Sequence, residues 1–267
     1  MPERTDVIYT CDDSLWGILC CVFESYTRRE LVTDILPEGT LSLFPTYPVQ
    51  TVEEHALRVY HSLERISNEL CAWVEDAWFS CAPDRAICIY RFIRMAYQWG
   101  APVLGMLAEP AVCAVYELVR TLRNEVHLMN EFLRFTEYNG ALVSEIEPKC
   151  ITLPRMQAHF TGRFPEETFL IFDRAHGLAL FYRPYEWSIQ EVEELQLPPL
   201  DEAEKAFQRL WKCYYESIAI QGRYNPACRM GHMPKRFWKH LTELSPKMLA
   251  AAAGPQVRQL PCPVWKE

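Results

Sequence analysis

The chain lacks the local motifs that mark several common classes of enzyme. It contains no G-x-x-x-x-G-K-[ST], no G-x-G-x-x-G, no G-x-S-x-G and no H-E-x-x-H. These patterns build the phosphate cradle of P-loop proteins, the dinucleotide site of Rossmann folds, the nucleophile elbow of serine hydrolases and a zinc-protease site. Their absence argues against nucleotide hydrolysis, Rossmann dinucleotide binding and serine-hydrolase chemistry.

The eleven cysteines lack the paired spacing of a metal site. No C-x-x-C pair occurs, Cys20 and Cys21 are adjacent, and the others are scattered along the chain. Local zinc and iron–sulfur motifs need closely spaced thiolates. We therefore expect no metal and no other cofactor. Scattered thiols in apolar segments are typical of a reducing compartment, so we expect a cytoplasmic protein with buried, reduced cysteines.

Long apolar runs are also missing. No run approaches the roughly 18 residues that indicate a membrane span, and Met1–Asp6 has no apolar signal core. A membrane partner is therefore not expected.

An overall positive charge is absent too. The 267 residues are 49% hydrophobic and 23% charged, as in ordinary globular proteins, and their formal net charge is −8. Any contact with nucleic acid must therefore come from a local basic patch.

Apolar residues recur at helical spacing through the first half of the chain. They predict helices over about 14–30, 52–77, 84–99 and 110–133, after a short strand at 7–10. Residues 34–51 contain prolines and little periodicity, which predicts a connecting loop with a short strand at Leu41–Phe44.

The middle third has short aromatic and β-branched segments bounded by turn residues. They are Phe132–Tyr138, Ala141–Glu147, Thr168–Asp173 and Gly177–Tyr182. Asn139-Gly140 is a strong hairpin signal because both residues tolerate positive φ. Together the segments predict an α+β fold, mainly helical, with a small antiparallel sheet formed by the middle third.

The last third combines a loop, a helix and a basic stretch. Residues 186–201 are acidic and contain prolines, which predicts a loop. A long helix follows, with a buried face formed by Ala203, Phe207, Leu210, Tyr214 and Ile218. We expect one domain over 1–244, with a helical part at 1–131, a sheet part at 132–185, basic helices at 202–244, and a flexible tail at 245–267.

The stretch from Lys205 to His240 contains eight Lys or Arg residues and one acid, Glu216, a local balance of +7. Cations bind phosphates without sequence preference, and the interleaved rings can stack on exposed bases. The alternative is a solvated basic face whose rings belong to the core. The candidate nucleic-acid ligands are Arg209, Lys212, Arg223, Tyr224, Asn225, Lys235, Arg236, Trp238 and Lys239.

A second group of residues could carry catalysis. Two histidines, two carboxylates and an arginine have the chemistry for acid–base work, provided that the fold brings them together. These candidates are Glu125, His127, His159, Arg163 and Asp173. The alternative is that each has a separate structural role.

Four blocks of sequence, in order, resemble a family of bacterial proteins of DNA metabolism and repair that is built on a domain of unknown function. The resemblance covers about residues 7–244. Its blocks are Tyr9 to Phe23 in Y-x-x-x-D-S-x-x-G-x-L-x-x-x-F, Arg123 to His127 with Phe132 to Phe135, Ile146 to Arg174, and Arg223 to Trp238 with the pairs Asn225-Pro226 and Met233-Pro234.

The resemblance implies work on DNA. Members of that family are encoded beside a radical SAM protein, and the domain also occurs fused to a uracil-DNA glycosylase-like domain. We therefore expect a DNA-binding accessory partner of a radical SAM enzyme. Two alternatives stay open: an enzyme acting on a damaged or modified nucleobase, and a protein-interaction scaffold whose basic face docks an acidic partner.

Overall fold

The computed structural model describes residues 4–244 and confirms an α+β fold. None of the helices in this range is long and apolar enough to cross a lipid bilayer. Where the sequence indicates one domain, the contacts group the chain into two compact units. Unit 1 is Met1–His127 with Pro148–Arg155, and unit 2 is Leu128–Glu147 with Met156–Glu267.

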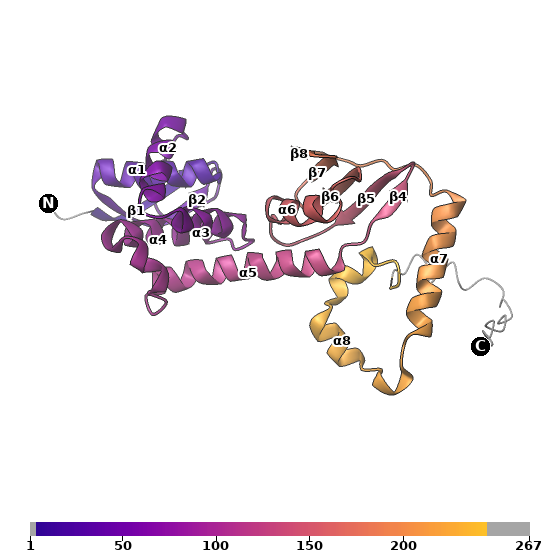
Figure 1. The fold of residues 1–267 in the computed structure, drawn as a ribbon. Helices are drawn as coiled ribbons and strands as arrows, with labels where there is room; N and C mark the ends of the chain where they lie inside the picture. Colours follow the sequence, from indigo (N-terminus) through magenta and orange to yellow (C-terminus); the bar gives the residue numbers. More distant parts are fainter. Residues whose placement is uncertain (1–3, 245–267) are drawn as a thin grey trace, which may run out of the picture. The chain divides into compact units, whose positions relative to one another are not determined.

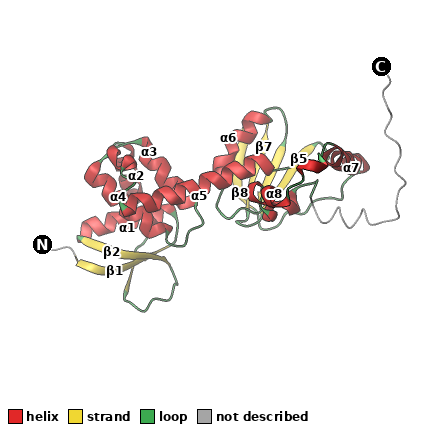
Figure 2. Cartoon of the chain, turned by 90° about the horizontal axis from the view of Figure 1, so that it is seen from below, coloured by secondary structure: helices red, strands yellow, loops and turns green. Residues whose placement is uncertain are grey.

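Unit 1 is built on a parallel three-stranded sheet with the strand order β2-β1-β3. Helices gather on one face of this sheet, as Figure 2 shows. The elements are β1 (Arg4–Cys11), α1 (Leu15–Arg28), β2 (Glu30–Pro37), β3 (Thr46–Pro48), α2 (Glu53–Glu64), α3 (Asn68–Phe79), α4 (Arg85–Trp99), η1 (Ala101–Gly105) and α5 (Pro110–Phe132), whose last turns belong to unit 2. Their apolar faces share one core, which contains Tyr9, Leu19 and Phe92.

The loop between β1 and α1 is fixed by a network of hydrogen bonds around Asp12. The carboxylate accepts from the backbone N–H and the hydroxyl of Ser14, at 3.0 and 2.7 Å, and from the hydroxyl of Thr51 at 2.9 Å. Ser14 in turn caps α1 by accepting from the N–H of Gly17. This network leaves no room beside Gly17, where an added Cβ would lie 2.2 Å from Asp12 Oδ1.

We expect Gly17→Ala to destabilise unit 1 by about 1–3 kcal/mol, since it displaces a carboxylate that holds three hydrogen bonds. Alanine alone would favour the helix by only about 1 kcal/mol. Gly162→Ala is the matched control, because Gly162 is also helical and an added Cβ meets nothing within 4 Å. Urea titrations of both variants compare the two effects, and equal free energies of unfolding would contradict the steric argument.

Unit 2 contains a five-stranded sheet with the order β4-β5-β6-β7-β8 (Figure 1). The sheet is mixed: β5 and β6 are parallel and the other neighbours are antiparallel. A parallel pair needs a crossover, and α6 provides it. The elements are β4 (Thr136–Tyr138), β5 (Ala141–Ile146), α6 (Leu153–Arg163), β6 (Phe169–Asp173), β7 (Leu178–Arg183), β8 (Glu186–Glu191), α7 (Glu202–Ser217), η2 (Gln221–Arg223), α8 (Pro226–His232) and η3 (Lys235–His240).

Phe135 fixes how α6 packs on this sheet. Its ring lies 5.8 Å from that of Phe160 on α6 and 5.7 Å from that of Phe169 on β6. At the other end of β4, Asn139 and Gly140 both have positive φ, as the predicted hairpin turn requires.

Several predictions of secondary structure need correction. The helix predicted over 52–77 is two helices, because Ser67 caps a new one at α3. The predicted loop at 34–51 contains the end of β2 and all of β3, while Leu41–Phe44 is not a strand. The predicted loop at 186–201 begins with β8, and the sheet is mixed where it was expected to be antiparallel. The tail at 245–267 lies outside the described residues.

The face of α7 that was predicted to be buried is exposed. Phe207, Leu210, Tyr214 and Ile218 are 62, 67, 53 and 56% exposed. The helix contacts the rest of the described unit through a neighbouring face instead, where Gln208 is buried and Trp211 donates a hydrogen bond to Glu243.

Candidate nucleic-acid interface

A buried carboxylate, Glu243, anchors the C-terminal segment of unit 2. One oxygen accepts from Arg134 Nη2 and the other from Trp211 Nε1, both at 3.1 Å. Arg134 follows α5 and Trp211 belongs to α7, so one side chain joins three parts of the chain. The segment from α7 to η3 is therefore attached to the unit at a defined point.

Two contacts of η3 strengthen this attachment. The buried ring of Phe237 lies 5.8 Å from that of Phe132. Lys239 forms an ion pair with Glu147, and this lysine holds the pKa of the Glu147 carboxyl below its usual range. Burial, reinforced by the charge of Lys239, lowers the pKa of the neighbouring His240.

The eight cations of residues 205–240 differ in their partners. Lys205 and Lys239 are paired with Glu202 and Glu147. Five others have no ion pair with any carboxylate in the described range: Arg209, Lys212, Arg223, Arg229 and Lys235. Arg209, Arg223 and Lys235 are exposed. Arg236 lies with its guanidinium carbon 4.6 Å from the ring centroid of Phe237.

Cations and rings alternate around α8. The guanidinium carbon of Arg229 lies 4.8 Å from the ring centroid of Trp238 and 6.0 Å from that of Tyr224. Lys235 Nζ lies 6.0 Å from the Trp238 ring on η3. Arg229 was not among the residues predicted from the sequence. Its place among the eight cations of the stretch from Lys205 to His240 was the available signal.

The chain reverses between α7 and α8 (Figure 1), and a hollow of about 730 Å³ opens at this elbow. Isoleucines form its apolar wall, the Tyr224 ring is 72% exposed, and two arginines and a glutamate supply charge. Lys212 lies on α7 about one turn before Glu216, which lines the hollow. The hollow is lined by Tyr215, Glu216, Ile218, Ala219, Ile220, Arg223, Tyr224, Asn225 and Arg229.

Three of the predicted ligands also have structural contacts within the segment. Asn225 accepts from the N–H of Cys228 and caps α8. Trp238 Nε1 donates to the carbonyl of Met233 at 3.0 Å, and Lys239 is held by Glu147. Arg223 and Tyr224, in contrast, are both exposed.

The five catalytic candidates are divided between the two units. Glu125 and His127 belong to unit 1, whereas His159, Arg163 and Asp173 belong to unit 2. Neither unit by itself therefore contains the predicted constellation. Within residues 4–244, no three His, Cys, Asp or Glu side chains form a group suited to hold a metal ion.

Both candidate carboxylates bind backbone amides. Glu125 accepts from the N–H groups of Lys149 and Cys150, at 2.8 and 3.2 Å. Asp173 accepts from the N–H groups of Ala175 and His176, and its second oxygen lies 2.7 Å from His176 Nδ1. Asp173 thus fixes the turn between β6 and β7, and both residues have the contacts of structural groups.

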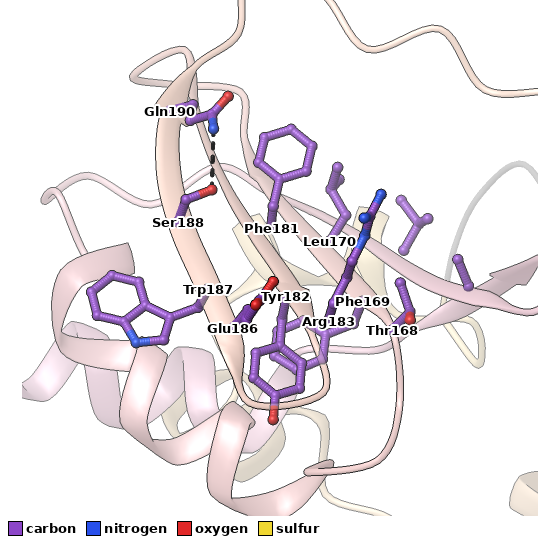
Figure 3. A pocket seen from close by; sticks show the side chains of 12 residues that line it. Thr168, Phe169, Leu170, Phe181, Tyr182, Arg183, Glu186, Trp187, Ser188 and Gln190 are labelled. Atoms are coloured by element: carbon purple, nitrogen blue, oxygen red, sulfur yellow. Dashed lines mark hydrogen bonds between the residues drawn. The ribbon is translucent and has the colours of Figure 1, made fainter.

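A second hollow, of about 560 Å³, lies on the sheet of unit 2. Figure 3 shows Leu170, Phe181 and Arg183 along it, with Ser188 and Gln190 joined by a hydrogen bond on β8. Leu170 and Phe181 are direct partners across β6 and β7. Of the residues that line it, Arg183 is the single cation and Glu186 the single acid. Its charge is balanced, so it fits phosphates less well than the C-terminal segment.

Comparisons with known proteins place the chain in a family. No match was found among curated proteins or among solved structures. The model of a family described as a domain of unknown function, DUF4130, matches residues 83–243, which is more than half of the chain. The description states no activity and no partner. The first of the four sequence blocks, near Tyr9, lies outside the matched residues. The protein therefore belongs to the family defined by this domain of unknown function.

Proposed function

We propose that this protein binds DNA through the segment from α7 to η3. The observation that carries the proposal is the set of five cations that have no ion pair with a described carboxylate: Arg209, Lys212, Arg223, Arg229 and Lys235. They occupy one continuous segment of a protein whose net charge is −8. Such a local patch in an acidic chain attracts phosphates without making the whole surface basic.

The geometry favours phosphate over a carboxylate partner within the protein. A structural arginine in a folded domain usually has an acceptor, as Arg134 does in Glu243. Arg223 and Lys235 are instead exposed; Lys235 lies near the Trp238 ring, and Arg223 lines the same hollow as Tyr224. Aromatic groups beside free cations are a common feature of surfaces that hold single strands.

The proposal extends to an accessory role beside a radical SAM enzyme. The support for this partner is the sequence resemblance alone. The DNA-binding segment would hold the nucleic acid while the partner enzyme supplies the chemistry. A pull-down between the two purified proteins, with and without DNA, tests this part separately.

We expect Arg209→Ala/Arg223→Ala to weaken binding to a labelled oligonucleotide. Each lost phosphate contact lowers the slope of log K against log salt by about 1, so the double variant should lose about 2. Fluorescence anisotropy at several salt concentrations measures both affinity and slope.

Lys205→Ala/Lys239→Ala is the charge-matched control, because both lysines are already paired with carboxylates. It removes two positive charges from the same segment, and its slope should change by less than half as much. No binding by the wild-type protein at low salt, or equal slopes in all three proteins, would refute the proposal.

A further inference from the structure

We infer that the elbow hollow between α7 and α8 takes one unstacked base of single-stranded DNA. This inference rests on the proposed function, because it names the form of nucleic acid that the same segment selects. The hollow is lined by apolar, aromatic and cationic groups.

The walls of the hollow fit the face of a base. Ile218 and Ile220 are 56 and 61% exposed, and the ring of Tyr224 is 72% exposed. Exposed apolar groups that converge on one hollow are stabilised when a flat, weakly hydrated ring covers them. A volume of about 730 Å³ lies in the range of small-ligand sites and admits a nucleobase with its sugar.

The charges around the hollow identify the ligand as a nucleotide within a strand. Arg223 and Arg229 both line it, and neither has an ion pair with a described carboxylate. A purely apolar peptide would leave these donors unmet, whereas the phosphates on either side of a base would satisfy them.

Polar groups in the wall can reach the edge of the base. The Glu216 carboxylate accepts hydrogen bonds, and Asn225 uses its oxygen to cap α8, which leaves its amide N–H groups as donors. Every base presents donors and acceptors on its Watson–Crick edge once it is unpaired. In a duplex those groups are paired and both faces of the base are stacked, so the hollow selects a single strand.

The test uses the full chain and three probes of one length: a single strand, the same sequence as a duplex, and a single strand of abasic sites with the same phosphates. We expect the single strand to bind most tightly. Tyr224→Ala should weaken its binding by about 5- to 150-fold, the equivalent of about 1–3 kcal/mol for loss of one stacked base. The same change should leave binding of the abasic strand within twofold.

Tyr214→Ala is the matched control, since Tyr214 is an exposed tyrosine on α7 that does not line the hollow. Tyr224→Trp should retain binding, because the indole also stacks. Equal binding of all three probes, with a normal salt slope, would overturn this inference and leave the proposed function intact. Binding of none of the probes at low salt would remove both.

Discussion

Asp76→Ala is expected to lower the free energy of unfolding of unit 1 by about 3 kcal/mol, near the lower end of the range for breaking a buried ion pair. Asp76 on α3 is 4% exposed and binds two arginines. Arg123 Nε and Nη2 lie 2.9 Å from one oxygen, and Arg155 Nε lies 2.6 Å from the other. The loss is at the lower end because Arg123 is 57% exposed and can regain water.

In Asp76→Ala, Arg155 keeps its contacts with Glu75 and Phe79. Arg155 Nη2 also lies 2.9 Å from Glu75, and its guanidinium carbon is 5.5 Å from the ring centroid of Phe79. Urea titration followed by circular dichroism measures the change. Arg120→Ala is the control, because its partner Glu117 is also exposed, and we expect a loss below about 0.5 kcal/mol. Similar losses in the two variants would show that Asp76 is not the central acceptor.

Glu125→Ala is expected to destabilise unit 1 by about 2–4 kcal/mol. The side chain is 4% exposed and accepts two backbone N–H groups, from Lys149 and Cys150. Without it, both amide groups are left buried and unsatisfied, which costs about 1–3 kcal/mol of stability for each. A water molecule that enters the site can restore part of this loss. Glu125→Gln keeps the shape and one acceptor, so a loss of about 1–2 kcal/mol is expected.

Glu125→Gln also distinguishes a catalytic role of Glu125 from a structural one. A catalytic carboxylate that contributes nothing to folding would leave the urea midpoint of Glu125→Gln unchanged, whereas a structural acceptor would lower it. Glu117→Ala, two turns earlier on α5 and partly exposed, is the comparison within the same helix. An unchanged midpoint in Glu125→Ala would return the residue to the list of catalytic candidates.

The sequence predicted those helices and turns that depend on residues close to one another in the chain. The spacing of apolar residues located α1 and α5, and Asn139-Gly140 marked the hairpin. In contrast, β3 is three exposed residues, and β8 is a polar edge strand. The partner of β3 is β1, which lies far back in the chain, and β8 pairs with the adjacent β7 but has few apolar residues, so neither has a strong pattern of its own. Periodicity also defined an apolar face on α7, but periodicity does not reveal what covers a face.

The candidate site, too, could be predicted only where its features are local in the sequence. Counting charges located the basic segment, yet only the structure distinguishes the paired Lys239 from Arg223, which lacks a described partner. The role of Asp76 was not visible in the sequence, because its two arginines lie 47 and 79 residues further along the chain. Contacts of that separation follow from tertiary structure and leave no local pattern.

The ion pairs of unit 1 have a practical consequence for any fragment of this protein. The family match begins at residue 83, yet Arg85, Arg123 and Arg155 are bound by carboxylates at Asp13 and Asp76, upstream of that boundary. A polypeptide cut at residue 83 would also uncover the buried face of α4, which packs against α1 and β2. The segment by which its relatives are recognised therefore leaves unit 1 incomplete, and expression trials should retain β1 to α3.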